Sequence, residues 1–207
     1  MSVVDAAVVA ELAPSGTLRV GINLSNFLLV SGQPPTGNPQ GVAPDLAGEI
    51  ADHLGVAVSF VPFESPGLLA DAAGQDVWDI GLIGAEPARA ERIAFTEAYS
   101  EIEVTYMVPP GSTIETIATV DRDGVRIAVS ARSAYDLYLT RNIERAELLR
   151  ANGLAASYEL FVDKKLDALA GLRPKLITEV EKLPGARVLD GRVTTVQQAV
   201  GTLRENM

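Results

Sequence analysis

The sequence has no cysteine and one histidine, His53, among its 207 residues. The absence of cysteine excludes disulfide bonds, thiolate nucleophiles and cysteine-ligated metal sites. A single histidine leaves no pair for a zinc site and little scope for acid–base chemistry, and we expect it on the surface of a helix. Because no cofactor motif is present either, we expect no cofactor, no metal and no catalytic residue.

Excess positive charge and long apolar runs are also missing. The formal net charge of −10 argues against nucleic acid or an anionic membrane surface as the main partner. No run approaches the roughly 20 apolar residues that span a bilayer, so we expect no direct membrane insertion. Residues 1–14 contain no Lys or Arg, unlike a Sec signal peptide. The chain is therefore either a mature or trimmed form, or a protein that acts in the cytoplasm.

What remains is an ordinary globular composition, 47% hydrophobic and 21% charged, with room for one large domain or two lobes. Periodicity and capping residues predict alternating helices and strands. We expect helices over 6–12, 44–54, 67–73, 134–142, 155–164 and 175–182. We expect strands or extended segments over 17–23, 56–63, 80–83, 102–108, 124–130, 166–172, 187–189 and 194–201, and a turn or hairpin over 33–41.

The most informative stretch runs from Val77 to Arg89. A strand that is apolar or glycine on both faces leads into Gly84 and Ala85, which leave room for close approach to the backbone. Pro87 suits a first helical position, so Arg89 would project from the first turn of a helix. An arginine beside a helix start suits an anion such as a carboxylate. The alternative is a solvated surface arginine.

The pattern then repeats. Residues 124–130 resemble residues 17–23, and residues 166–172 parallel residues 78–84, each with an aspartate before an apolar strand that contains glycine. Two such halves predict two α/β lobes, each with a mostly parallel sheet. Because open α/β sheets bind ligands beyond the carboxyl ends of their strands, we expect one ligand cleft between the lobes. The candidate ligand-binding residues are Asn23, Asn26, Phe27, Ile83, Gly84, Ala85, Arg89, Ser130, Arg132, Ser133, Ala134, Tyr135 and Leu172.

The order and spacing of several motifs resemble the extracellular solute-binding protein family 3, which has the type II periplasmic-binding-protein fold. These motifs are Leu18-Arg19-Val20-Gly21-Ile22, Gly41-Val42-Ala43-Pro44-Asp45-Leu46-Ala47, Trp78-Asp79-Ile80, Pro87-Ala88-Arg89, Ile93-Ala94-Phe95-Thr96-Glu97-Ala98-Tyr99, Val125-Arg126-Ile127-Ala128-Val129 with Ser133, and Leu166-Asp167-Ala168-Leu169. The resemblance covers about residues 16–202. It implies residues 1–101 with 195–207 as lobe 1, residues 102–194 as lobe 2, an ABC permease as partner, a periplasmic location and a monomer.

The resemblance also implies roles for single residues. Arg89 matches the family's arginine that pairs with the ligand α-carboxylate, and Ser133 matches the Ser/Thr that binds the same group from lobe 2. Phe27 lies where the family often places an aromatic ring over the ligand. The loop over 23–27 and the turn over 83–85 would supply backbone contacts.

Three departures from the family pattern qualify this interpretation. The turn before Arg89 is short and has no hydroxyl side chain. Leu172 stands where amino-acid binders place an acidic residue for the ligand ammonium. Glu86, Glu101 or Glu103 could replace that residue, or the ligand could be a carboxylate without an amine. Finally, the chain ends at Met207 where family members continue, so we expect the C-terminal lobe 1 helices to be missing.

Arg132 and Arg173 near the expected cleft favour an acidic ligand, or they are solvated loop charges. The leading hypothesis is the substrate-binding component of an ABC transporter for a small polar or carboxylate-bearing solute. One alternative is a cyclohexadienyl-dehydratase-like enzyme with Glu86 or Glu103 as general acid. The other is a cytoplasmic ligand-sensing domain.

Overall fold

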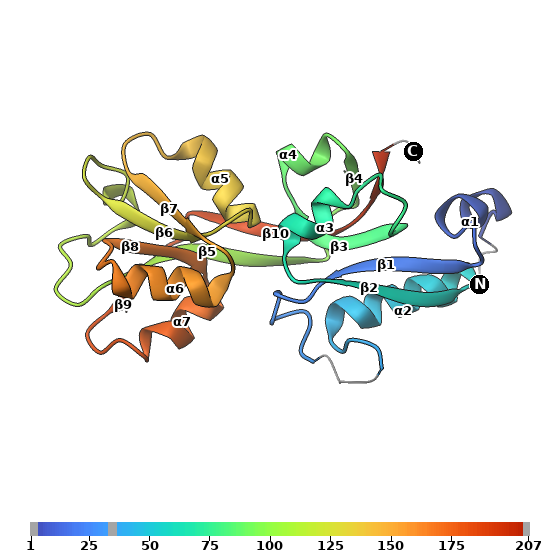
Figure 1. Cartoon of the computed structure of the whole chain (residues 1–207), viewed down its shortest axis with the longest axis horizontal. Helices are drawn as coiled ribbons and strands as arrows, with labels where there is room; N and C mark the ends of the chain where they lie inside the picture. Colours follow the sequence, from blue (N-terminus) through green and yellow to red (C-terminus); the bar gives the residue numbers. More distant parts are fainter. Residues whose placement is uncertain (1–3, 33–36, 205–207) are drawn as a thin grey trace. The chain divides into compact units, whose positions relative to one another are not determined.

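The computed structural model describes residues 4–32 and 37–204. The chain divides into two compact units, residues 1–99 with 198–207 and residues 100–197. Each unit contains parallel strands with flanking helices (Figure 1). The mostly parallel α/β architecture predicted from the sequence is therefore confirmed. Part of the expected hairpin, residues 33–36, lies outside the described residues.

Unit 1 is built on three neighbouring parallel strands in the order β2-β1-β3. Its strands are β1 (Thr17–Asn23), β2 (Ala57–Phe63), β3 (Ile80–Ala85) and β4 (Ile93–Phe95), and β4 pairs antiparallel with β10 (Thr194–Leu203). Its helices are α1 (Ala6–Leu12), α2 (Val42–Leu54), α3 (Pro66–Asp71) and α4 (Pro87–Ala90). Strand β10 begins in unit 2 and ends in unit 1.

The two faces of the unit 1 sheet carry different cores. On one face, Leu18, Val20 and Ile22 pack with small residues of α2. On the other, Leu69 of α3 packs with Trp78. Glycine is required on that second face, because a Cβ on Gly81 would lie 2.9 Å from Leu69 Cδ2. The alternation of side chains along β1 thus produces a three-layer helix–sheet–helix unit.

Unit 2 has the strand order β5-β8-β6-β7, in which β6 pairs parallel with β7 and β8 while β5 runs antiparallel to β8. Its strands are β5 (Ser100–Val108), β6 (Arg126–Ser130), β7 (Glu147–Ala151), β8 (Ala168–Leu172) and β9 (Arg187–Val188), which pairs with β5. Its helices are α5 (Ala134–Asn142), α6 (Leu154–Asp163), α7 (Arg173–Val180) and the 3-10 turn η1 (Ile117–Thr119). Phe161, Met107 and Leu176 belong to its core.

The sequence analysis missed β7 entirely. This strand lies at the edge of the sheet and is only partly buried, so its residues lack a strong apolar pattern. Helix α7 begins at Arg173, two residues before the expected start, because Pro174 fits the first turn of a helix. The other expected elements are present with small shifts of their ends.

The internal repeat has a physical counterpart in both units. In unit 1 the carboxylate of Asp79 accepts hydrogen bonds from the backbone N–H of Arg19 at 2.7 Å and from Arg19 Nη2 at 2.6 Å. In unit 2 Asp167 accepts from the backbone N–H of Arg126 at 2.8 Å, and Arg126 Nε lies 3.5 Å from it. Each aspartate therefore fixes the start of a central strand to its parallel neighbour.

Candidate functional site

In unit 1, candidate residues follow the carboxyl ends of two neighbouring parallel strands. Strands β1 and β3 pair in register through Ile22 and Leu82, so Asn23 and Ile83 follow at the same edge of the sheet. The loop after β1 and the turn after β3 therefore leave the sheet side by side. Within this unit the structure brings together the loop over 23–27 and residues 83–85, but residues 83–85 are the last residues of strand β3 and not the turn that the sequence predicted.

The loop after β1 is an ordered turn. Asn23 Oδ1 accepts hydrogen bonds from the Ser25 backbone N–H at 3.2 Å and from Ser25 Oγ at 2.7 Å. Asn26 is buried, whereas Phe27 exposes 38% of its surface. Asn23 is thus occupied in shaping the turn, and Phe27 presents an apolar ring to its surroundings.

Arg89 is not a solvated surface arginine, because only 6% of it is exposed. Its Nη1 donates a 2.7 Å hydrogen bond to the carbonyl of Gly84 near the end of β3. Glu86, also buried, caps α4 by accepting a 3.0 Å hydrogen bond from the Ala88 backbone N–H. The four-residue helix therefore holds a guanidinium group and a carboxylate together at the end of a buried strand.

In unit 2 the turn between β6 and α5 is equally well defined. Ser130 and Ser133 are buried, and Ser133 Oγ accepts a 3.0 Å hydrogen bond from the Asp136 backbone N–H. The predicted N-cap is therefore confirmed. Arg132 is exposed and has a positive φ of 60°. Its backbone N–H donates to Asp136 Oδ2 at 2.7 Å, which holds this uncommon conformation in place.

Two residues that hold this turn in place were missed by the sequence analysis. Asp136 is 3% exposed, and its Oδ1 accepts a 2.9 Å hydrogen bond from Nε of Arg150 on β7. The Ser133-x-x-Asp136 spacing resembles a capping box and could have revealed Asp136. Arg150 could not be found in this way, because it comes from the edge strand that the sequence did not predict.

The remaining candidates of unit 2 are mainly apolar. Ala134 and Tyr135 are buried in the first turn of α5, and burial raises the pKa of the Tyr135 hydroxyl to about 12. Leu172 is buried at the end of β8. The next residue, Arg173, donates to Glu103 Oε2 at 2.9 Å and to the carbonyls of Leu189 and Gly191. This arginine is therefore engaged in contacts within its own unit.

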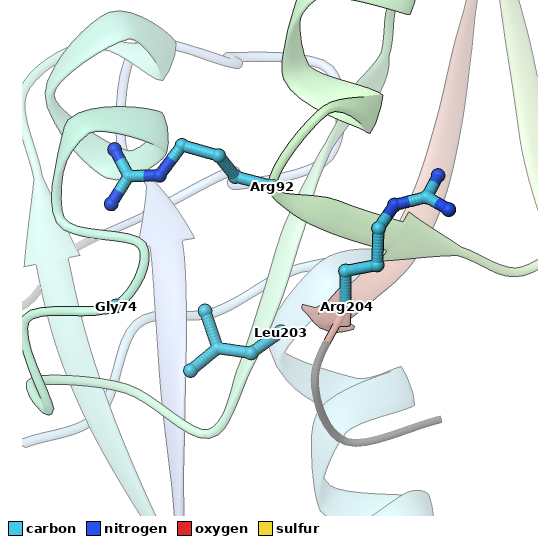
Figure 2. Close-up of a pocket in the computed structure, with 4 residues that line it drawn as sticks. All are labelled: Gly74, Arg92, Leu203 and Arg204. Atoms are coloured by element: carbon cyan, nitrogen blue, oxygen red, sulfur yellow. The ribbon is translucent and has the colours of Figure 1, made fainter.

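A hollow of about 380 Å³ in unit 1 is lined by Gly74, Arg92, Leu203 and Arg204, none of them a predicted site residue (Figure 2). The two guanidinium groups point away from each other. Arg92 Nη2 donates to the Ala73 carbonyl, and Arg204 Nε donates to the Ala90 carbonyl at 2.9 Å. These arginines stabilise the main chain and do not converge on one point of the hollow.

Across residues 4–32 and 37–204, no group of three His, Cys, Asp or Glu side chains is placed to hold a metal ion. In the same part of the chain, no helix is long and apolar enough to cross a bilayer.

Comparison with known proteins identifies relatives of this chain. A family model described as "Bacterial extracellular solute-binding proteins, family 3" matches residues 18–205. The L-cystine-binding protein TcyJ of Escherichia coli (strain K12) is 23% identical over 206 residues, which is 99% of this chain and 77% of the relative.

Two solved structures share the fold at low sequence identity. The Gly52Ala mutant of arginine-bound ArgBP from T. maritima has a TM-score of 0.75 and 20% identity, covering 95% of this chain and 92% of that chain. The ancestral amino acid-binding protein AncCDT-1, a precursor of cyclohexadienyl dehydratase, has a TM-score of 0.75 and 21% identity. The match covers 96% of this chain and 86% of that chain.

Proposed function

Because the chain belongs to family 3 of the bacterial extracellular solute-binding proteins, we propose that it binds an amino acid and delivers it to an ABC permease. The observation that carries the proposal is the buried Arg89, held at the end of β3 by the Gly84 carbonyl. A buried guanidinium binds a carboxylate strongly, because few water molecules compete for its donors. Relatives that bind cystine and arginine support an amino acid as the ligand.

Unit 2, taken by itself, also contains a candidate site for an anion. The Ser133 cap and the Asp136 bond to the Arg132 backbone fix the start of α5, a nine-residue helix. Backbone N–H groups at such a start favour a negative charge. We therefore propose Arg89 as the carboxylate-binding residue of unit 1, and the turn around Ser133 as the candidate anion site of unit 2 taken by itself.

We propose binding without catalysis. The general acid of a dehydratase would have to be Glu86 or Glu103. Glu103 is exposed and paired with Arg173, and Glu86 is engaged as the cap of α4. Incubation with prephenate or arogenate should give no aromatic product, and formation of that product would favour the enzyme.

We further propose a periplasmic location and a monomeric state, which fractionation of cells and light scattering would test.

Isothermal titration calorimetry against a panel of amino acids and organic acids tests the proposal. Arg89→Met should weaken binding of the best ligand at least tenfold. Arg92→Met is the matched control, because Arg92 also donates to a main-chain carbonyl but lies on the separate hollow. A folded wild-type protein that binds no member of the panel would refute the proposed function.

A further inference from the structure

Gln198 of β10 is a buried residue whose side-chain amide has no hydrogen-bond partner among the described residues. Only 6% of the residue is exposed. Its amide is not sealed inside the core, because the fully enclosed unpaired atoms include the Tyr99 hydroxyl but neither polar atom of the Gln198 side chain. Buried polar groups nearly always have a partner, and this amide is open to one that comes from outside the chain.

The main chain around Gln198 is held in place by hydrogen bonds on both sides of the residue. The Gln198 carbonyl accepts from the Tyr99 backbone N–H at 2.9 Å. Two residues further on, the Val200 carbonyl accepts from the Thr96 backbone N–H at 2.9 Å, and the Val200 N–H donates to Thr96 Oγ1 at 3.2 Å. The side chain of Gln198 therefore projects from a fixed point of the strand.

Gln198 lies level with the carboxyl end of β3, which is the neighbour of β10 in the sheet. Thr202 Oγ1 donates to the carbonyl of Asp79, the residue before β3, at 3.1 Å. Since β10 ends one residue after Thr202 while all of β3 follows Asp79, the two strands run antiparallel. Four residues of strand cover about 13 Å, which places Gln198 beside Gly84. The carbonyl of Gly84 is the acceptor that holds Arg89.

The side chain of Gln198 also lies on the face of the sheet that carries the loop after β1. Val200 packs in the same apolar cluster as Leu24 and Leu28 of that loop, whereas Leu203 packs in the cluster on the other face. Because side chains alternate along a strand, Gln198 shares the face of Val200. The proposed carboxylate-binding arginine and an unpaired amide therefore lie at the same edge of the unit 1 sheet.

We propose that Gln198 is a specificity-determining residue that binds the polar side chain of the ligand. This inference rests on the proposed function, in which Arg89 binds the ligand carboxylate. The amide of Gln198 offers two N–H donors and a carbonyl acceptor, and it carries no charge. It therefore fits a hydroxyl or an amide group, whereas an ionised side chain at this point would lose water and gain no opposite charge. The ligand is an amino acid with an uncharged polar side chain.

The first test uses the unmodified chain and sets of amino acids that match in size. Calorimetry compares glutamine with glutamate and methionine, asparagine with aspartate and leucine, and threonine with valine. In the set that contains the best ligand, the uncharged polar member should bind at least tenfold more tightly than the others. Binding without this preference would overturn the inference and leave the solute-binding function intact, whereas no binding of any amino or organic acid would overturn both.

Two neighbouring glutamines then provide a matched pair of variants. Gln197 is exposed, and its side chain donates to Glu101 Oε1 at 3.3 Å. Gln198→Leu should weaken the best ligand at least tenfold and leave its apolar counterpart within about twofold, because the apolar side chain makes no hydrogen bond to lose. Gln197→Leu should change neither affinity. Equal losses of both ligands in Gln198→Leu would indicate a purely structural role and overturn the assignment.

Gln198→Glu gives an independent readout, since glutamate keeps the size of the side chain and adds a negative charge. The affinity for lysine relative to the best ligand should rise at least tenfold, because the new carboxylate compensates a cationic side chain. Circular dichroism confirms that each variant is folded. An unchanged ratio of the two affinities in folded Gln198→Glu would show that residue 198 does not contact the ligand side chain.

Discussion

The repeated aspartate–arginine pairs allow one interaction to be measured at two degrees of burial in the same protein. Asp79 has 7% of its side chain exposed and Arg19 has 28%, whereas Asp167 and Arg126 expose 39% and 42%. Both aspartates accept from the backbone N–H of their partner. Each can be changed to asparagine, which keeps the shape and removes the charge.

We expect Asp79→Asn to lower the free energy of unfolding of unit 1 by about 3 kcal/mol. The change replaces a buried carboxylate that Arg19 Nη2 binds at 2.6 Å by an uncharged amide, and the remaining partner of Arg19, Asp76, is 91% exposed and compensates the guanidinium charge less well. Asp167→Asn should cost about 1 kcal/mol or less, because exposed ion pairs contribute little and water can reach Arg126. At 1 M salt the Asp167 effect should shrink further, since exposed charges are screened more than buried ones.

Equilibrium urea unfolding measures both changes. Trp78 is the one tryptophan and is buried in unit 1, so its fluorescence reports unit 1, while far-ultraviolet circular dichroism reports the whole chain. With a slope of about 1–3 kcal/mol/M, the Asp79 change should lower the unit 1 midpoint by about 1–3 M. Equal costs for the two substitutions would refute the view that burial sets the strength of these pairs.

Three further predictions concern stability. Gly41→Ala should lower the free energy of unfolding by about 2–4 kcal/mol in urea, because φ is +124° and the new Cβ would lie 2.5 Å from the Leu29 carbonyl oxygen. The control is Gly48→Ala, which has open space around it and should raise the free energy of unfolding by up to about 1 kcal/mol. Burial raises the pKa of Glu179, but hydrogen bonds from Lys175 and Lys182 outweigh burial and lower the pKa below its usual 4.5. The ionised carboxylate therefore stabilises the folded state above pH 4.5, and this contribution is lost as the pH falls. Glu179→Gln should flatten that part of the pH dependence of the free energy of unfolding, and an unchanged pH profile would contradict the prediction. Ser133→Ala should cost about 1 kcal/mol in thermal unfolding and Ser133→Asn much less, because asparagine can still cap α5.

Local chemistry explains why the sequence alone predicted most of the elements. Gly55 ends α2 in the left-handed conformation, Ser133 caps α5, and alternating apolar residues define β1, and each of these signals lies within a few residues. The repeated pattern also predicted the α/β architecture, since an aspartate before each apolar strand marks equivalent positions.

Only the tertiary structure decided which polar side chains are buried and what they touch. The spacing in the sequence left Arg89 open to two interpretations, and its burial against Gly84 excluded the solvated one. Arg150 became visible only through its bond to Asp136, because an edge strand gives a weak pattern. The loop that contains Asn26 is likewise held from a distance in sequence, because the Ala43 backbone N–H of α2 donates to the Leu29 carbonyl. Burial and long-range hydrogen bonds are properties of the packed chain, and they determine the chemistry of its candidate site.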